Sequence, residues 1–164
     1  MTAGGKTAKE LMEQLKADPD FLAKKAKNDA QFEELERICE ADEYELICEL
    51  NSRGFHVKSV WDLVNNAPHE FLERNFVGSY EDAYPILVKH LTISHHQRIR
   101  EGIIRALTEK NAKRIAFAPL LEQLNLEPLK CNRWVIANAL RTMLTKAERA
   151  KYPEVDEAYG AGYL

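Results

Sequence analysis

Apolar residues recur at intervals of three and four along most of this chain, which is the spacing of one face of an α-helix. The clearest stretch runs from residue 94 to about residue 109, where one face carries Ile99, Ile103, Ala106 and Leu107. No segment shows the alternation of apolar and polar residues that is typical of a half-buried strand. The pattern therefore predicts an all-α protein.

The first 43 residues are expected to form an N-terminal helical extension. Thr7 and Glu10 have the spacing of a capping box, which predicts the start of a short helix. Asp18 and Pro19 predict the start of a second helix, which continues to about Asn51. Its first part has almost no apolar face, and a regular apolar stripe begins only at Phe32.

Short helices joined by polar loops are predicted for the rest of the chain. We expect them at 57–64, 68–76, 84–91, 94–109, 115–124 and 129–144, with Gly78 ending the second of these. Residues 145–164 follow as a C-terminal cap or tail.

Two of these segments repeat each other. IREGIIRAL, from Ile99, aligns without a gap on NRWVIANAL, from Asn132, so that Arg100 corresponds to Arg133. Upstream, PILVKHL from Pro85 aligns on PLLEQL from Pro119, and VKSVWDLVN from Val57 is a fainter earlier copy. The period of about 33–34 residues and two helices per unit indicate a helical repeat protein.

Residues 44–144 resemble the HEAT-repeat family. The usual unit has proline and leucines in its first helix, and a second helix that opens on Val/Ile-Arg and is rich in alanine and leucine. The matching residues are Pro85, Leu87, Leu91, Ile99, Arg100, Ala106, Leu107, Pro119, Leu121, Leu124, Arg133, Ala139 and Leu140.

The resemblance implies a right-handed α-solenoid of about three helical hairpins, whose second helices line a concave binding surface. The family often has an aspartate at the turn, where this chain has His95 and His96. An Arg–Asp contact between adjacent repeats is therefore in doubt.

Charge is unevenly distributed, although the net charge is only −3. Residues 1–96 have 11 basic and 18 acidic side chains, whereas residues 97–151 have 12 basic and 5 acidic ones. Such a charge asymmetry can steer a charged partner toward the protein. The alternative is that the uneven count arises by chance on an ordinary surface of mixed charge.

The last two second helices are expected to present a partner-binding stripe. Arg98, Glu101 and Arg105 share one helix face, and Trp134, Asn138 and Arg141 share the equivalent face one repeat later. Tryptophan and arginine are enriched in binding hot spots. The alternative is that the C-terminal segment, from Tyr152 onward, folds back and covers Trp134 as the cap of the array.

A second candidate is the acidic stretch between residues 33 and 49, which includes Glu36, Glu40 and Glu43. These side chains could receive a cationic protein. A solvated helix face is the other interpretation.

No catalytic, cofactor or metal motif is recognised. The three cysteines fit neither a disulfide framework nor a zinc spacing, and are interpreted as reduced thiols in the cytoplasm. HEFLE, from His69, lacks the second histidine of a zinc protease helix, and adjacent His95 and His96 should point apart. No secretory leader or membrane span is expected.

The leading hypothesis is a non-enzymatic protein-binding module, either an adaptor or an immunity-type protein that neutralises a toxin. A second class is a HEAT-like DNA-binding protein or alkylpurine glycosylase. It would bind phosphates through Arg98, Arg105, Lys110, Lys113, Arg114, Arg133 and Arg141. A bilin lyase related to HEAT proteins is a third alternative.

Overall fold

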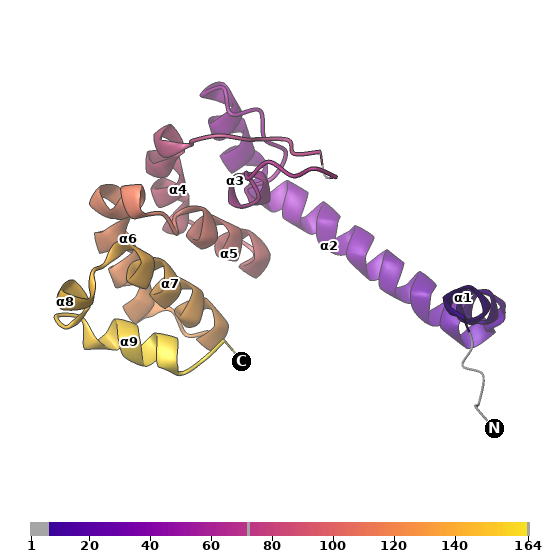
Figure 1. Cartoon of the computed structure of the whole chain (residues 1–164). Coiled ribbons are helices and arrows are strands. Elements are labelled where there is room, and N and C mark those ends of the chain that lie inside the picture. The colour runs from indigo at the N-terminus through magenta and orange to yellow at the C-terminus, as the bar shows by residue number, and fades with distance from the viewer. Residues whose placement is uncertain (1–6, 72, 164) are drawn as a thin grey trace. The chain divides into compact units, whose positions relative to one another are not determined.

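The computed structural model describes residues 7–71 and 73–163 (Figure 1). These residues form helices and irregular segments, and none of them lies in a strand, as the apolar spacing predicts. The helices are α1 (Ala8–Ala17), α2 (Pro19–Ser52), α3 (Trp61–Val64), α4 (Tyr84–Leu91), α5 (Gln97–Ala106), α6 (Lys113–Leu126), α7 (Lys130–Met143), α8 (Lys146–Arg149) and α9 (Pro153–Gly160). Within the described residues, no helix is both long and apolar enough to cross a lipid bilayer.

The chain divides into two compact units, one ending at Ile38 and the other beginning at Cys39. Helix α2 continues without a break through this boundary. Cys39 and Glu43, which belong to the expected N-terminal extension, are buried residues of the second unit.

The first unit contains α1 and the N-terminal part of α2. The capping box at Thr7 is present, since the Glu10 amide donates to Thr7 Oγ1 and the Thr7 amide donates to Glu10 Oε2 at 2.8 Å. Asp18 caps α2 by accepting from the amides of Asp20 and Phe21 at 3.0 and 3.3 Å. Local signals in the sequence therefore determine where both helices begin.

In the second unit, neighbouring helices follow the order of the repeat. Helix α3 packs on α5, α5 on α7, and α7 on α9, while α4 packs on α6. The core side chains recur at the predicted spacing, and each member of the following pairs is 0% exposed: Leu87 and Leu120, Leu91 and Leu124, Ile103 and Ile136, and Leu107 and Leu140. The two hairpins α4–α5 and α6–α7 are thus packed with equivalent leucines and isoleucines.

Close approach of α3 to α5 depends on Gly102. A Cβ at this position would lie 2.6 Å from Val60 Cγ1 and 3.1 Å from Trp61 Nε1, which is too close for unshifted atoms. The glycine therefore leaves room for the side chains that begin α3.

The helix predicted at 68–76 is wrong. The described residues of this stretch are irregular, and Phe71 is 85% exposed. Phe76 is held instead by edge-to-face contacts with Phe55 and Tyr80, at centroid distances of 5.8 and 6.3 Å. The predicted helix at 57–64 is shorter than expected, since only Trp61–Val64 is helical.

Candidate partner-binding face

Four of the six residues predicted to form the binding stripe belong to one connected set of side chains. The set comprises Glu101 and Arg105 of α5, Trp134 and Arg141 of α7, Tyr159 of α9, and Tyr163 after it; we call it the arginine–aromatic face. Since α5 packs on α7 and α7 on α9, three consecutive helices contribute to it.

The α5 part of this face is an ion pair that is tied to the C-terminal segment. Arg105 Nη2 lies 2.7 Å from Glu101 Oε1, and Tyr163 Oη donates to Glu101 Oε2 at 3.2 Å. Desolvation and the neighbouring Glu101 charge raise the pKa of Tyr163, so this hydroxyl stays protonated and remains a donor at neutral pH.

Trp134 lies at the centre of the arginine–aromatic face. Its ring stacks on Tyr159 with centroids 5.4 Å apart at 22°, and it meets Tyr163 edge-on at 5.6 Å and 90°. The C-terminal segment therefore does fold back onto Trp134, which is half-buried. Burial of Val155 and Ala158 anchors α9 in this position.

Arg141 completes the face on its far side. Its Nη1 pairs with Asp156, and its guanidinium lies 4.2 Å above the centre of the Tyr159 ring. The geometry is that of a cation–π contact reinforced by a carboxylate. Of the other predicted stripe residues, Arg98 is exposed and Asn138 is half-buried.

No motif in the sequence indicated that Tyr159 and Tyr163 belong to this face, or that Asp156 pairs with Arg141. They belong to a 13-residue tail with three acids and no base, whose contacts depend on how α9 packs. The expectation that a terminal repeat needs a cap is the one signal that pointed toward them.

The acidic candidates do not share one environment. Glu36 and Glu40 are exposed on α2, whereas Glu43 is only 4% exposed. Glu43 Oε2 accepts from the Val60 amide at 2.9 Å and from Ser59 Oγ at 3.1 Å, next to the start of α3. Burial raises the pKa of its carboxyl. Glu43 is therefore inaccessible to a docking partner in this structure.

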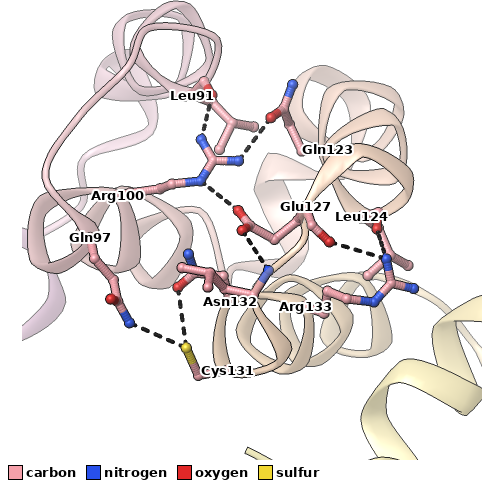
Figure 2. A network of polar contacts seen from close by, with 10 residues as sticks. Leu91, Gln97, Arg100, Gln123, Leu124, Glu127, Cys131, Asn132 and Arg133 are labelled. Atoms are coloured by element: carbon pink, nitrogen blue, oxygen red, sulfur yellow. Dashed lines mark hydrogen bonds and ion pairs between the residues drawn. The ribbon is translucent and has the colours of Figure 1, made fainter.

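The arginine that recurs in the repeat, as Arg100 and Arg133, has a structural role (Figure 2). Arg100 Nη1 donates to the Leu91 carbonyl at 3.0 Å, Nη2 to Gln123 Oε1 at 2.8 Å, and Nε to Glu127 Oε2 at 2.9 Å. Arg133 Nη1 donates in the same way to the Leu124 carbonyl at 2.5 Å. Each arginine thereby satisfies a carbonyl at the end of the preceding helix.

The turn at His95 and His96 has no aspartate to pair with the repeat arginine, and Glu127 provides the carboxylate for Arg100 instead. It is 8% exposed, lies in the turn between α6 and α7, and also accepts from the Leu129 amide at 3.1 Å. An arginine–carboxylate contact is thus present, and it joins Arg100 of α5 to a glutamate in the α6–α7 turn.

Four of the seven basic side chains proposed as a phosphate track are engaged within the protein. Arg105 pairs with Glu101, Lys113 with Glu148, Arg141 with Asp156, and Arg133 binds backbone carbonyls. These contacts reduce the positive charge available to a polyanion.

A chain of histidines and carboxylates, which the sequence analysis did not identify, lies in the second unit. His95 Nδ1 is 2.9 Å from Asp42 Oδ2, His95 Nε2 is 3.0 Å from His90 Nδ1, and His90 Nε2 is 3.4 Å from Glu49 Oε1. His90 is 1% exposed, and burial lowers its pKa despite the nearby Glu49.

His96 points elsewhere, as expected for a neighbour of His95, with Nδ1 3.7 Å from Cys39 Sγ. No three His, Cys, Asp or Glu side chains among the described residues are arranged to hold a metal ion. The series Asp42–His95–His90–Glu49 links α2 to α4 and to the turn before α5, so its role is to hold these elements together by side-chain hydrogen bonds.

Comparison with known proteins does not add an identity. No family model, no curated protein sequence and no solved structure matches this chain.

Proposed function

We propose that this chain is a non-enzymatic protein-binding module built as a right-handed α-solenoid of HEAT-like hairpins. The solenoid interpretation is supported by the recurrence of buried core residues from α4–α5 to α6–α7 and by the matching hydrogen bonds of Arg100 and Arg133. Stacked hairpins of this kind present an extended and rigid surface.

The single observation that carries the binding proposal is the arginine–aromatic face. Tryptophan, tyrosine and arginine dominate the energetics of protein interfaces because they bury much area and still form directed polar contacts. Here they form a connected set on three neighbouring helices, in which Tyr159 and Tyr163 pack on the half-buried Trp134 as a cap and the Glu101–Arg105 ion pair holds the α5 part. Fixed side chains lose little entropy when a partner binds.

The partner we propose is a protein segment with carboxylates. Arg98 is exposed next to this face and is the first candidate to receive a carboxylate, whereas Arg105 is half-exposed and would share its charge between Glu101 and the partner. A guanidinium can bind a carboxylate through two parallel hydrogen bonds, which favours an acidic partner over a neutral one. An adaptor and an immunity-type protein that neutralises a toxin both belong to this class of function.

A reducing compartment suits the cysteines. Cys39, Cys48 and Cys131 are all free thiols, and we propose a cytoplasmic location on this basis.

The test is affinity capture from the native host with the full chain and with a double variant, Arg98→Glu and Arg105→Glu. We expect proteins captured by the wild type to be lost from the double variant, because both side chains would then repel an acidic partner. Quantitative mass spectrometry of the eluates measures the loss.

The matched control combines Lys110→Glu and Arg114→Glu, which makes the same charge change at two exposed residues outside the arginine–aromatic face. Capture that is equal for all three proteins would contradict the proposal. Recovery of nucleic acid with a steep dependence on salt would favour the DNA-binding alternative instead.

A further inference from the structure

A groove of about 370 Å³ is lined by both the turn from α4 to α5 and the turn from α6 to α7. Three apolar side chains that line it, Ile93, Leu126 and Leu129, are 39%, 66% and 46% exposed, and the buried Leu91 lines it as well. None of the residues that line this groove belongs to the arginine–aromatic face. The groove is therefore a separate surface feature, with aliphatic side chains along it.

Asn132 lines this groove and is a buried polar residue at a position where the preceding repeat has an apolar one. It corresponds to Ile99 in the alignment of the two repeats, and the two residues are 2% and 1% exposed. A buried carboxamide costs free energy unless its donors and acceptors are satisfied. An asparagine at this core position therefore needs an explanation other than packing.

One half of the Asn132 carboxamide has no hydrogen-bond partner within the protein. Cys131 Sγ lies 3.9 Å from Asn132 Oδ1, and Gln97 Nε2 donates to Cys131 Sγ at 3.2 Å. Asn132 Nδ2 donates to no group among the residues that the structure describes, and Figure 2 shows it on the side of the carboxamide away from Cys131. Because Asn132 lines the groove, this donor is available to a molecule that enters it.

Two glutamines add polar groups to the same groove. Gln123 Oε1 accepts from Arg100 Nη2 at 2.8 Å, which leaves the amide nitrogen of Gln123 as a donor. Gln97 donates through Nε2, which leaves its Oε1 as an acceptor. Arg100 and Glu127 also line the groove but pair with each other at 2.9 Å, and both ring nitrogens of His95 are already bonded. The groove thus presents amide donors and an acceptor, and its two opposite charges compensate each other.

We propose that this groove binds an extended segment of a partner protein through its peptide groups and an uncharged aliphatic side chain. A peptide group has one carbonyl acceptor and one N–H donor, which match the open donors of Asn132 and Gln123 and the open acceptor of Gln97. The aliphatic side chain packs against Leu126 and Leu129. A charged side chain would lose its hydration without meeting an opposite charge. This second site does not rest on the function of the arginine–aromatic face.

The first experiment titrates the full chain with capped pentapeptides and follows its backbone amide signals by NMR. The peptides have leucine, glutamate, lysine or glycine at the centre, and serine and glycine elsewhere. The leucine peptide should cause saturable shifts in residues 91–97 and 126–132, and the other three should bind about tenfold more weakly. Equal binding of all four peptides, or no saturable shift in these residues, would overturn the proposal.

The second experiment repeats the titration with Asn132→Ile, which introduces the residue that the preceding repeat has at this position. The variant should be at least as stable as the wild type, because it removes a buried donor without a partner. It should bind the leucine peptide about fivefold more weakly, which corresponds to the loss of one hydrogen bond. The matched control Asn125→Ile, at an exposed residue of α6 that does not line the groove, should bind as the wild type does. Unchanged binding by Asn132→Ile would refute the role of this asparagine.

A third variant tests the apolar side of the groove without a risk to folding. Leu129 is the N-cap residue of α7 and is 46% exposed, and aspartate is a favourable N-cap residue. Leu129→Asp should therefore fold as well as the wild type but bind the leucine peptide about tenfold more weakly. Full binding by this variant would contradict the proposal.

The double variant Arg98→Glu and Arg105→Glu separates this site from the arginine–aromatic face. It should lose the proteins captured through that face and still bind the leucine peptide with wild-type affinity, because neither arginine lines the groove. Loss of peptide binding in this double variant, with shifts that map to the arginine–aromatic face in the wild type, would show that the groove is not the site.

Discussion

Arg100 and Arg133 donate the same hydrogen bond one repeat apart, each from Nη1 to the carbonyl oxygen of the leucine nine residues earlier. Their other partners differ. Arg100 also pairs with Glu127, with the two side chains 16% and 6% exposed, whereas Arg133 reaches backbone carbonyls.

We therefore expect unequal effects from the same substitution. Arg100→Met should lower the free energy of unfolding by about 3–5 kcal/mol, because it leaves a buried carboxylate without its partner. Arg133→Met should cost about 1–2 kcal/mol, the loss of hydrogen bonds to carbonyls. Urea denaturation measures both. If adding Glu127→Leu to Arg100→Met restored no stability, the explanation through the buried charge would be wrong.

Substituting Trp134 should release α9 from α7. Trp134→Ala removes the stacking on Tyr159 and the edge contact with Tyr163, and we expect a loss of about 2–4 kcal/mol. Hydrogen exchange should accelerate in α9 well before it does in α6. Tyr163→Phe, which removes only the hydroxyl bonded to Glu101, should cost about 1 kcal/mol or less. Unchanged protection of α9 in Trp134→Ala would refute the anchoring role of the tryptophan.

Glu43 should be more sensitive to truncation than to loss of charge. Glu43→Ala leaves the Val60 amide without its acceptor and should cost about 1–3 kcal/mol. Glu43→Gln keeps an acceptor oxygen and removes a buried charge, so its stability should stay within about 1 kcal/mol of the wild type.

The stability of the wild type and that of Glu43→Gln should depend differently on pH, in a direction that follows from the pKa of Glu43. Burial raises the pKa of Glu43 above its ordinary value of 4.5, so the folded protein binds this proton more readily than the unfolded chain. The wild type therefore loses stability as pH rises through the raised pKa, whereas Glu43→Gln does not. Urea midpoints at pH 4 and pH 7 should shift in favour of Glu43→Gln at the higher pH. A shift in the opposite direction would contradict the assignment.

His90 should produce the opposite trend. Burial is the main cause that lowers its pKa below the ordinary 6.5; the His95 and Lys89 charges act in the same direction, and Glu49 opposes them. The unfolded chain then binds more protons than the folded one, so the stability associated with neutral His90 is complete above pH 6.5 and declines as pH falls through the lowered pKa.

Replacing His90 by glutamine should flatten this part of the pH profile. The free energy of unfolding of the wild type and of His90→Gln, measured from pH 8 to pH 5, gives the comparison. His56→Gln serves as the control because His56 is an exposed histidine. Equal slopes for the wild type and His90→Gln would show that His90 does not titrate as proposed.

Elements with local signals were predictable from the sequence. The start of α2 follows from Asp18 and Pro19, and its length to Ser52 follows from helical spacing and the absence of a breaking residue. The equivalence of Ile103 with Ile136 was readable from the repeat, since core positions must recur when hairpins stack. The alignment of Pro85 on Pro119 is one residue out, because the buried counterpart of Leu87 is Leu120 and Leu121 is only half-buried.

Contacts between distant segments were not predictable in the same way. Glu43 reads as a surface residue, and only the approach of α3 turns it into a buried acceptor. His90, His95 and Asp42 are brought together by the packing of α2 on the α4–α5 turn, for which no sequence spacing exists. The segment 68–76 has helix-compatible residues, but its Phe76 packs against Phe55 and Tyr80 in an irregular stretch, so tertiary contacts overrode the local preference there.

The hydrogen bonds of Arg100 and Arg133 also define how this protein could grow. A tandem duplication of residues 94–126 would place the copied Arg100 nine residues after Leu124, and Arg133 nine residues after the copied Leu124. Each arginine would again be nine residues from a leucine carbonyl, so the same hydrogen bond could form at every junction. A single duplication could therefore add one helical hairpin without requiring a new type of contact between hairpins.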